Sequence, residues 1–426
     1  MAKKTALLQP PKGFRDFLPQ EASRRRQVLE KMIGVFERFA FEPLETPALE
    51  YASVLEGKYG EEERLIFSFE DRGGRRLALR FDQTVPLARV IAQHSNELPM
   101  PFKRYQIQAN WRAEKPQAGR FREFVQCDFD IIGTPSPLAD AEILAVTNAV
   151  LSELGFKKFF ILYNDRRVLT DMIKKCGIAK EQEEATIRIL DKLEKIDEPS
   201  VIEELEKAGI AKTKIEALMS FIGRRPLLPG QKKSDISLDP INEVTSLLKS
   251  VAVPRTRVMY TPTLARGLNY YTGMIMEVAI DGYEAGSVGG GGRYDGLLGM
   301  FSGQSIPAVG FSFGLDRLIE AMQTLELFPP AQSGTRVLVT IFNEKLSAKS
   351  AEVANLLRDH GINTSLYLNP TEKLDKQIKY ADKKSIPVVV IVGPQEAQSG
   401  SATVKYLKTG MQETVPLADL PQLLQK

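Results

Sequence analysis

The chain has 426 residues, 43% of them hydrophobic and 26% charged, so it can bury a large core and hold two or three domains. Its 57 Lys and Arg against 54 Asp and Glu give a net charge of +3, which leaves only local patches for any nucleic-acid contact. The 2 cysteines and 2 histidines are too few for a disulfide framework or a structural zinc site. No apolar run has the length of a signal peptide or a membrane helix. We therefore expect a cytoplasmic protein without membrane segments.

The first predicted elements are a helix and an extended piece. Apolar residues from Val28 to Phe39 recur at helical spacing after Pro19. The next stretch, FEPLETPALE, carries Pro43 and Pro47, and proline disfavours helix in the residue before it. It is predicted to be an edge strand or a segment that crosses a subunit boundary.

A hairpin around Gly73 and Gly74 is predicted between Arg64 and Phe81, where apolar and polar residues alternate. Asp82 and Thr84 follow at the junction with a predicted helix. Such a junction is a common place for ligand-binding groups, and a helix cap is the equally favoured alternative.

The stretch WRAEKPQAGRFREFVQCDFD, residues 111–130, predicts two strands joined by a basic loop, with Pro116 and Gly119 in the turn. On the second strand Gln126, Asp128 and Asp130 share one face, because side chains alternate across a strand. Such a polar face is an unusual core, and we interpret it as a floor for a charged small molecule. A surface hairpin with scattered charges is the alternative.

The middle of the chain predicts a helix over residues 139–154, a buried strand FFILYND, and then a Lys- and Glu-rich helical block from Asp171 to about Gln231. This block has the composition of a separate insertion. Its charges form either a solvated face or a basic side that contacts a partner.

Two stretches that follow are unusual for plain strands. Tyr270 and Tyr271 precede an apolar strand, and buried phenols need hydrogen-bond partners, so they are predicted to line a pocket. The glycines 289–292 allow a backbone to approach a ligand or another strand closely, with a tight turn as the alternative. The GxxxxGK[ST] pattern of a phosphate loop is absent.

PAVGFSFGLDRL, from Pro307, predicts a strand that becomes a helix at Gly314. Arg317 in the first helical turn opposes the helix dipole, so we expect it to bind an anion. The proline-rich linker LFPPAQSG then precedes an α/β domain of alternating strands and helices. Five lysines give one of its helices a basic side, which supports a nucleic-acid surface only weakly because solubility also explains it. They are Lys373, Lys376, Lys379, Lys383 and Lys384.

Together these motifs resemble the histidyl-tRNA synthetases, a family of class II aminoacyl-tRNA synthetases. PLETPALE, residues 111–130 and PAVGFSFGLDRL resemble the three class II motifs, and ARGLNYYTG and GGGGRYDG resemble the two histidine-specific ones. The resemblance implies an α+β fold with an antiparallel sheet flanked by helices. The expected domains are a catalytic domain over 1–170 and 233–328, a helical insertion over 171–232, and an anticodon-binding α/β domain over 334–426.

The resemblance also implies roles for individual residues. Arg112, Arg266 and Arg317 match the catalytic arginines that bring the histidine carboxylate to the α-phosphate of ATP. ATP-binding positions are Arg112, Glu114, Arg120 and Arg317, with Mg²⁺ on the pyrophosphate and no protein metal site identified. Histidine-binding positions are Asp82, Gln83, Thr84, Arg112, Gln126, Asp130, Arg266, Tyr270 and Tyr271.

The implied partners are tRNA(His), through an acceptor-end contact at Lys115, Pro116 and Gln117, and a second copy of the chain. The motifs depart from the family pattern at two points. Phe81, Asp82 and Gln83 replace the bacterial proline and glutamate before Thr84, as in eukaryotic members, and Asn269 replaces an aspartate. The alternative function is a non-catalytic paralogue, the regulatory subunit of ATP phosphoribosyltransferase. The presence of Arg112, Arg266, Arg317 and the last domain disfavours it.

Overall fold

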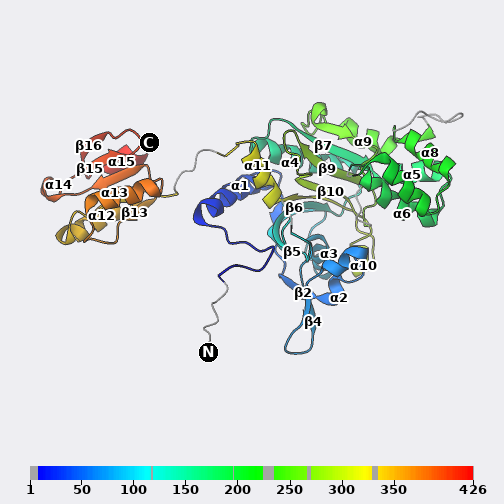
Figure 1. Cartoon of the computed structure of the whole chain (residues 1–426), viewed down its shortest axis with the longest axis horizontal. Helices are drawn as coiled ribbons and strands as arrows, with labels where there is room; N and C mark the ends of the chain where they lie inside the picture. Colours follow the sequence, from blue (N-terminus) through cyan, green and yellow to red (C-terminus); the bar gives the residue numbers. More distant parts are fainter. Residues whose placement is uncertain are drawn as a thin grey trace. The chain divides into compact units, whose positions relative to one another are not determined.

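The computed structural model describes residues 8–116, 119–194, 196–223, 235–265, 270–328 and 334–425. The chain divides into two compact units (Figure 1). The first contains residues 1–16 and 25–327, and the second contains residues 17–24 and 328–426.

A large sheet is the centre of the first unit. Across the described residues it has eight strands in the order β1-β5-β6-β11-β10-β9-β7-β8. The pairs β1–β5 and β7–β8 at its two edges are parallel and the others antiparallel, so the sheet is mixed where an antiparallel one was expected. The strands are β1 (Glu42–Pro43), β5 (Phe102–Trp111), β6 (Glu123–Ile132), β7 (Phe159–Asp165), β8 (Val258–Tyr260), β9 (Met274–Ile280), β10 (Gly289–Arg293) and β11 (Ala308–Gly314).

One face of this sheet is apolar and is covered by helices. Phe129 is fully buried there, with its ring 5.1 Å from that of Phe36 and 5.8 Å from that of Phe311. Phe36 belongs to α1 (Pro19–Arg38), the helix predicted after Pro19. The helices α4 (Pro137–Glu153) and α11 (Leu315–Thr324) also pack on β6 and β11. Burial of these aromatic and aliphatic side chains is the main stabilisation of the unit.

The predicted glycine segment is a strand, β10, between β9 and β11, so the tight-turn alternative is wrong. A Cβ at Gly289 would lie 2.6 Å from Ser312 O, and one at Gly291 would overlap Gly310 O. The glycines therefore let neighbouring strands and side chains approach the β10 backbone.

A second, small sheet is formed by residues that come before β5 in the chain. Within the described residues it has three antiparallel strands, β2 (Leu49–Tyr51), β4 (Arg76–Leu79) and β3 (Ser68–Glu70), so the predicted hairpin is confirmed. The helix α3 (Thr84–Gln93) then starts at Thr84. The extended stretch before β2 contributes the edge strand β1, as one of the two interpretations predicted.

The Lys- and Glu-rich block is helical in its described part, up to residue 223, as predicted, and the rest of the predicted range lies outside the described residues. Its helices are α5 (Arg166–Lys175), α6 (Lys180–Leu190), α7 (Glu198–Lys207) and α8 (Lys212–Phe221). Each buries aliphatic residues on one side, so the block has its own core. A further helix, α9 (Asp239–Leu247), packs on α4.

The second unit is an α/β domain whose described strands form a five-stranded sheet in the order β13-β12-β14-β15-β16. The predicted alternation of strands and helices is present, and two short helices, α14 and α15, were not predicted. The elements are β12 (Val337–Val339), α12 (Ser347–Asp359), β13 (Thr364–Leu366), α13 (Leu374–Lys383), β14 (Val388–Ile391), α14 (Pro394–Ser399), β15 (Ser401–Tyr406), β16 (Gln412–Pro416) and α15 (Leu420–Gln425). Among the described residues no helix is long and apolar enough to span a membrane.

Candidate active site

The second face of the large sheet is polar but buried. Its side chains alternate with those of the apolar face along β5 and β6, as the period of two requires. Each has less than a tenth of its surface exposed: Arg104, Gln106, Asn110, Asp128 and Asp130. Buried polar groups are costly unless they are paired, so their partners indicate what the face does.

Arg104 is fully buried beside two carboxylates. Its Nη2 lies 2.7 Å from Asp130 Oδ2 and 4.0 Å from Asp128 Oδ2. The Tyr294 hydroxyl donates to the other Asp130 oxygen. A Cβ on the facing residue, Gly310, would overlap the Asp130 carboxyl group, so the glycine makes room for this arrangement. Asp130, a predicted histidine-binding residue, is thus held from two sides.

Asp128 lies between Gln126 and Asp130 on the same face, and sequence reasoning did not name it as a binding residue. Burial raises its pKa to about 7, and Arg104 opposes this shift. Among the described residues its Oδ1 has no hydrogen-bond partner. The period-two alternation in QCDFD had already placed Asp128 on this face, and the same signal could have named it as a binding residue.

A directed chain of hydrogen bonds fixes the Gln126 amide. Arg80 Nε donates to Asn110 Oδ1 at 3.1 Å, and Asn110 Nδ2 donates to Gln126 Oε1 at 2.8 Å. Gln126 Nε2 then donates to Ser312 Oγ at 2.6 Å, and the Ser312 hydroxyl lowers the pKa of Asp128 by hydrogen bonding. The amide therefore has one defined orientation on the floor of the site.

The start of α3 lies against β5 at the site. Asp82 Oδ1 accepts hydrogen bonds from the backbone N–H groups of Thr84 and Val85, both at 3.1 Å, and from the Tyr59 hydroxyl at 2.9 Å. The Asp82 side chain therefore accepts hydrogen bonds from the first turn of α3, although Gln83 occupies the N-cap position, and this does not exclude a ligand role. Burial raises the pKa of Asp82, while backbone hydrogen bonds and the Arg112 charge lower it. Asp82 is thus held beside a cation near the Tyr59 ring.

Gln83 points into the sheet. Its Nε2 donates to the backbone carbonyl groups of Gln108 at 3.0 Å and Gln126 at 3.2 Å, and the residue is fully buried. Gln83 therefore ties the start of α3 to β5 and β6. Thr84 begins the helix and is partly exposed.

The two predicted pocket tyrosines lie over the same face. The Tyr270 ring is 4.9 Å from that of Tyr271 and 6.1 Å from that of Tyr294, which donates to Asp130. Burial and the neighbouring Asp82 raise the pKa of Tyr59, and Tyr270 adds to this shift. A Cβ at Gly292 would lie 2.8 Å from Tyr271, so Tyr271 rests on the glycine strand. The tyrosines thus connect the Asp82 and Asp130 groups.

Residues 266–269 lie outside the described residues, so the structure gives no position for Arg266 or Asn269. The same holds for Gln117 in the loop that joins β5 to β6.

Arg112 follows directly after β5 and is held between two aromatic rings. Its guanidinium carbon lies 4.3 Å from the centre of the Phe81 ring and 5.1 Å from that of Phe124. Its Nε donates to the Phe81 carbonyl at 3.1 Å. No described residue accepts a hydrogen bond from its two terminal nitrogens. Stacking fixes the plane of the cation and leaves those nitrogens for another acceptor.

Arg317 lies at the start of α11, against the loop of residues 112–122. Its Nη1 donates to the Ser287 carbonyl at 2.6 Å. Burial lowers its pKa first and the nearby Arg120 charge lowers it further, while Glu114 opposes both. Arg120 lies 3.6 Å from Glu114, and a Cβ at Gly119 would be 3.5 Å from Arg317. Two cations close together at the edge of a buried site favour a polyanionic ligand.

The strand register shows how the acidic and tyrosine residues lie relative to Arg112 and Arg317. Gln126 pairs with Gly314 on β11 and with Gln108 on β5, so the end of β5 and the start of α11 lie at one end of the sheet. Arg112 and Arg317 extend from that end. The acidic residues and the tyrosines lie on the same face of the sheet, next to this end.

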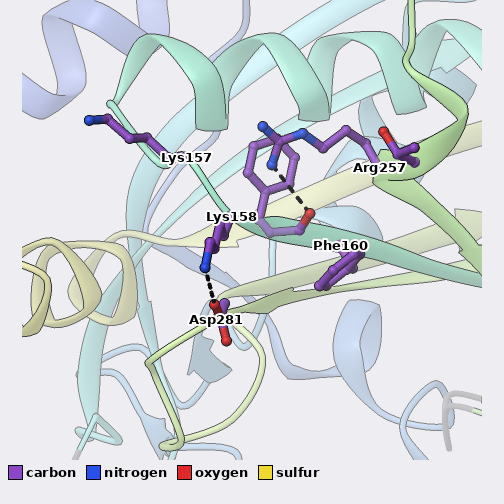
Figure 2. Close-up of a pocket in the computed structure, with 7 residues that line it drawn as sticks. Lys157, Lys158, Phe160, Arg257 and Asp281 are labelled. Atoms are coloured by element: carbon purple, nitrogen blue, oxygen red, sulfur yellow. Dashed lines mark hydrogen bonds and ion pairs between the residues drawn. The ribbon is translucent and has the colours of Figure 1, made fainter.

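A separate shallow hollow lies at the sheet edge formed by β7, β8 and β9 (Figure 2). Lys158 pairs with Asp281 there at 3.6 Å, and Arg257 stacks on Phe159 at 4.2 Å. It contains none of the predicted site residues, so the polar face remains the candidate active site.

Comparison with known proteins decides the family. The family model "Histidyl-tRNA synthetase" matches residues 13–318, and the model "Anticodon binding domain" matches residues 336–426. The chain is 40% identical to the histidine–tRNA ligase of Aeropyrum pernix over 98% of both chains. It is also 40% identical to that of Rhodopirellula baltica over 93% of both chains. The chain belongs to the histidyl-tRNA synthetase family.

Solved structures agree with this assignment. The crystal structure of histidyl-tRNA synthetase from Nostoc matches with a TM-score of 0.86 and 33% identity, covering 98% of this chain and 99% of that one. A Bacillus halodurans structure titled ATP phosphoribosyltransferase regulatory subunit/histidyl-tRNA synthetase matches with a TM-score of 0.74 and 21% identity, which shows a shared fold only. The expected family and α+β fold are therefore confirmed.

Proposed function

We propose that this histidyl-tRNA synthetase activates L-histidine with ATP to histidyl-adenylate and pyrophosphate, and then transfers histidine to the 3′ end of tRNA(His). The observation that carries the proposal is the buried polar sheet face, where two acidic groups and two tyrosines adjoin arginines at one end of the sheet. The acidic part suits the α-ammonium group and the ring N–H of histidine, and the basic part suits a nucleotide triphosphate.

In the histidine pocket, Asp82 is the proposed partner of the α-amino group, together with Thr84. Asp130 and Tyr271 are the proposed partners of the two imidazole nitrogens, with Gln126 and Tyr270 beside them. A neutral imidazole has one N–H and one acceptor nitrogen, and a pocket that pairs both rejects apolar amino acids strongly. Gln83 supports the pocket through its bonds to β5 and β6.

On the nucleotide side, Arg112 is the proposed contact of the α-phosphate, and Arg317 binds ATP with Glu114 and Arg120. Fixed cations stabilise the charge that develops on the phosphate as the histidine carboxylate attacks it. The aromatic clamp of Phe81 and Phe124 supports this role, because a held guanidinium needs no reorganisation during the reaction. Arg266 is the third proposed catalytic arginine.

We propose that Mg²⁺ arrives with the triphosphate. Among the described residues no group of three or more His, Cys, Asp or Glu could hold a metal ion. Mg²⁺ commonly binds through one or two carboxylates and substrate phosphates, and Glu114 beside Arg317 fits such a contact. When bound, Mg²⁺ would neutralise charge on the departing pyrophosphate.

The second unit is proposed to bind the anticodon of the tRNA. The proposed domains are a catalytic domain over 1–170 and 233–328, a helical insertion over 171–232 and the anticodon-binding domain over 334–426. The anticodon-binding family match supports this proposal. It also disfavours the non-catalytic regulatory paralogue, as does the presence of Arg112, Arg266 and Arg317 in the sequence.

We also propose that the protein is a homodimer. The small sheet exposes an apolar face formed by Leu49, Tyr51 and Phe69, which are 42%, 54% and 47% exposed. Leu77 pairs with both Tyr51 and Phe69 across this face. It continues from PLETPALE, which resembles the class II motif at the dimer interface. Tyr51→Glu should shift the protein to a monomer in sedimentation experiments, whereas Arg72→Glu, at the hairpin turn, should not.

A cytoplasmic location is proposed because both cysteines, Cys127 and Cys176, are free and buried. Free buried thiols fit a reducing compartment.

The deciding experiment is ATP–pyrophosphate exchange with each amino acid in turn. Histidine alone should support exchange, and Arg266→Ala should abolish most of it. Removal of the residues after Gly334 should preserve exchange and impair tRNA charging. Exchange with a different amino acid, or with none, would contradict the proposal.

A further inference from the structure

A short extended segment near the N-terminus, Gly13–Asp16, lies against the base of the loop of residues 112–122; we call it the strap. The Gly13 carbonyl accepts hydrogen bonds from the backbone N–H groups of Arg122 at 2.9 Å and Glu123 at 3.4 Å. Gly13 has φ +90°, and a Cβ there would lie 2.7 Å from Arg122 Cγ. Only glycine fits this contact without strain.

Arg15 of the strap joins two parts of the site. Its guanidinium carbon lies 3.2 Å from the centre of the Phe121 ring, at the end of the loop. Its Nη2 donates to Asp316 Oδ1 at 2.7 Å, and Asp316 directly precedes Arg317 in α11. One side chain therefore connects the loop that carries Arg112 and Arg120 with the helix turn that carries Arg317.

Asp316 is a buried junction with a second cation. Arg25 Nη1 donates to the same Asp316 oxygen at 2.5 Å, and the Val125 N–H lies 3.4 Å from the other. The Asp316 side chain is only 5% exposed. Loss of Arg15 therefore does not leave an unpaired buried carboxylate, because Arg25 remains. The stacking on Phe121, by contrast, is lost entirely.

The loop is anchored from outside at its Arg112 side, where the Ala113 N–H donates to the Leu65 carbonyl at 2.8 Å and Arg112 Nε donates to the Phe81 carbonyl at 3.1 Å. Arg112 N–H donates to the Arg122 carbonyl at 2.9 Å, and Arg122 Nε donates to the Glu114 carbonyl at 3.1 Å. Both contacts lie within the loop, so they shape it without fixing it to the rest of the unit. The strap contributes contacts from outside the loop, to Phe121, Arg122 and Glu123.

We propose that the strap is a positioning element for ATP binding, with Arg15 as its main positioning residue. It holds the loop of residues 112–122 against the start of α11, so that the loop cations and Arg317 face the same triphosphate. Arg15 does not itself contact substrate in this proposal. The inference rests on the proposed nucleotide-binding role of Arg112, Glu114, Arg120 and Arg317.

The test uses ATP–pyrophosphate exchange with ATP and histidine varied separately. Arg15→Ala should raise the KM for ATP about tenfold and leave the KM for histidine within about twofold, because the histidine groups lie on β6 and α3. Arg15→Lys should recover part of the effect, since a lysine keeps the ion pair with Asp316 but cannot stack as a flat cation. Arg26→Ala is the matched control on α1, where Arg26 is 81% exposed, and should change neither constant.

Hydrogen exchange of the full-length protein gives a readout independent of activity. Amides of residues 119–123 should exchange faster in Arg15→Ala and in Gly13→Ala than in wild type, while those of β6 beyond Gln126 should not. Unchanged kinetics and exchange in Arg15→Ala would overturn the proposal. An equal rise in both KM values with a lower melting temperature would also overturn it, since that pattern indicates a general structural role.

The two proposals fail separately. Wild-type protein without histidine-dependent exchange would reject the proposed function, and the strap would then be judged by hydrogen exchange alone. Wild-type protein with exchange, and an Arg15→Ala variant that matches it in all constants and amide rates, would reject the strap only.

Discussion

The two faces of the large sheet are made by the same strands and have opposite chemistry. On β6, Cys127 and Phe129 pack with aromatic rings on one side, while Asp128 and Asp130 surround Arg104 on the other. Apolar burial stabilises a fold by itself. A buried ion cluster is weak evidence for stability, because desolvation offsets much of the attraction between the charges. The apolar face therefore explains the fold, and the polar face fits the ligand-binding role proposed for it.

The largest effect tests the apolar face. Phe129→Ala should lower the free energy of unfolding by about 3–5 kcal/mol, because it leaves a cavity among the rings of Phe36, Phe41 and Phe313. The KM values of the folded fraction should not change. Urea unfolding measures the loss of stability, and steady-state kinetics at low temperature measures the KM values. Phe160→Ala, on the other face and 40% exposed, should cost less than about 1 kcal/mol.

Arg112→Ala tests the polar face in the opposite way. Loss of one fixed cation at the reacting phosphate should lower the rate of histidine activation by about 10²–10³-fold, or about 3–4 kcal/mol of transition-state stabilisation. Stability should change little, since Arg112 is partly exposed. Arg72→Ala, at the exposed hairpin turn, is the control for a lost surface charge. Equal losses of stability and rate would break the distinction between the faces.

The pH dependence of stability sharpens the comparison. Burial raises the pKa of Asp128 from 3.8 to about 7, so the folded state binds this proton more tightly than the unfolded state. Stability should therefore decline as pH rises from about 4 to about 7 and level off above that. Asp128→Asn removes this contribution. Between pH 5 and 7 the free energy of unfolding of the variant should therefore rise relative to that of wild type by about 1–2 kcal/mol.

Denaturant titrations at several pH values measure that difference. The pKa values of Asp82 and Asp130 are also raised by burial, and Asp130 is coupled to Asp128, so the difference reports the titration of Asp128 together with its effect on Asp130. A difference that stays constant with pH would show that Asp128 titrates below this range.

The smallest effect concerns the orientation of Gln126. Ser312→Ala removes the acceptor of the Gln126 amide at 2.6 Å and should raise the KM for histidine about three- to tenfold, equivalent to about 1 kcal/mol. The KM for ATP should stay within about twofold. Ser246→Ala, on the exposed side of α9, should leave both unchanged. A larger effect on ATP than on histidine would contradict the assignment of this part of the face.

Much of the fold follows from local pattern. The strand β6, the helical insertion and the strand–helix alternation of the second unit have regular apolar periods, so the sequence predicts them. The first strand of the hairpin expected within residues 111–130 is misplaced, because β5 ends at Trp111 and Arg112 and Glu114 lie in the loop. The parallel pairing of the edge strands β1 and β8 was missed, because strands of two or three residues carry no signal of their direction in the sheet. The glycine strand was ambiguous for a related reason: four glycines have no side chains to show alternation, and only the neighbours Ser312 and Tyr271 explain them.

The site was predictable in part. The family resemblance named Asp130 and Asp82, and the positions of Asp130 on a strand and of Asp82 before a helix follow from sequence. Arg104, Tyr59 and Tyr294 were missed, although they hold these carboxylates. They come from separate strands and loops, and their proximity depends on tertiary pairing that no local pattern records. The extended arm of Gly13–Asp16 is visible in the sequence, but its contacts were missed likewise, since a short arm has no periodicity.

Glycines of β10 and β11 limit the substitutions that this enzyme can accept. Even a methyl group at Gly292 would lie 2.5 Å from the Met274 carbonyl and 2.8 Å from Tyr271, and one at Gly310 would enter the Asp130 carboxyl group. No residue other than glycine is smaller than alanine, so single substitutions offer no intermediate step at these positions. In a saturation library these sites should tolerate nothing else, and any redesign of the amino-acid specificity would have to begin with the residues around them.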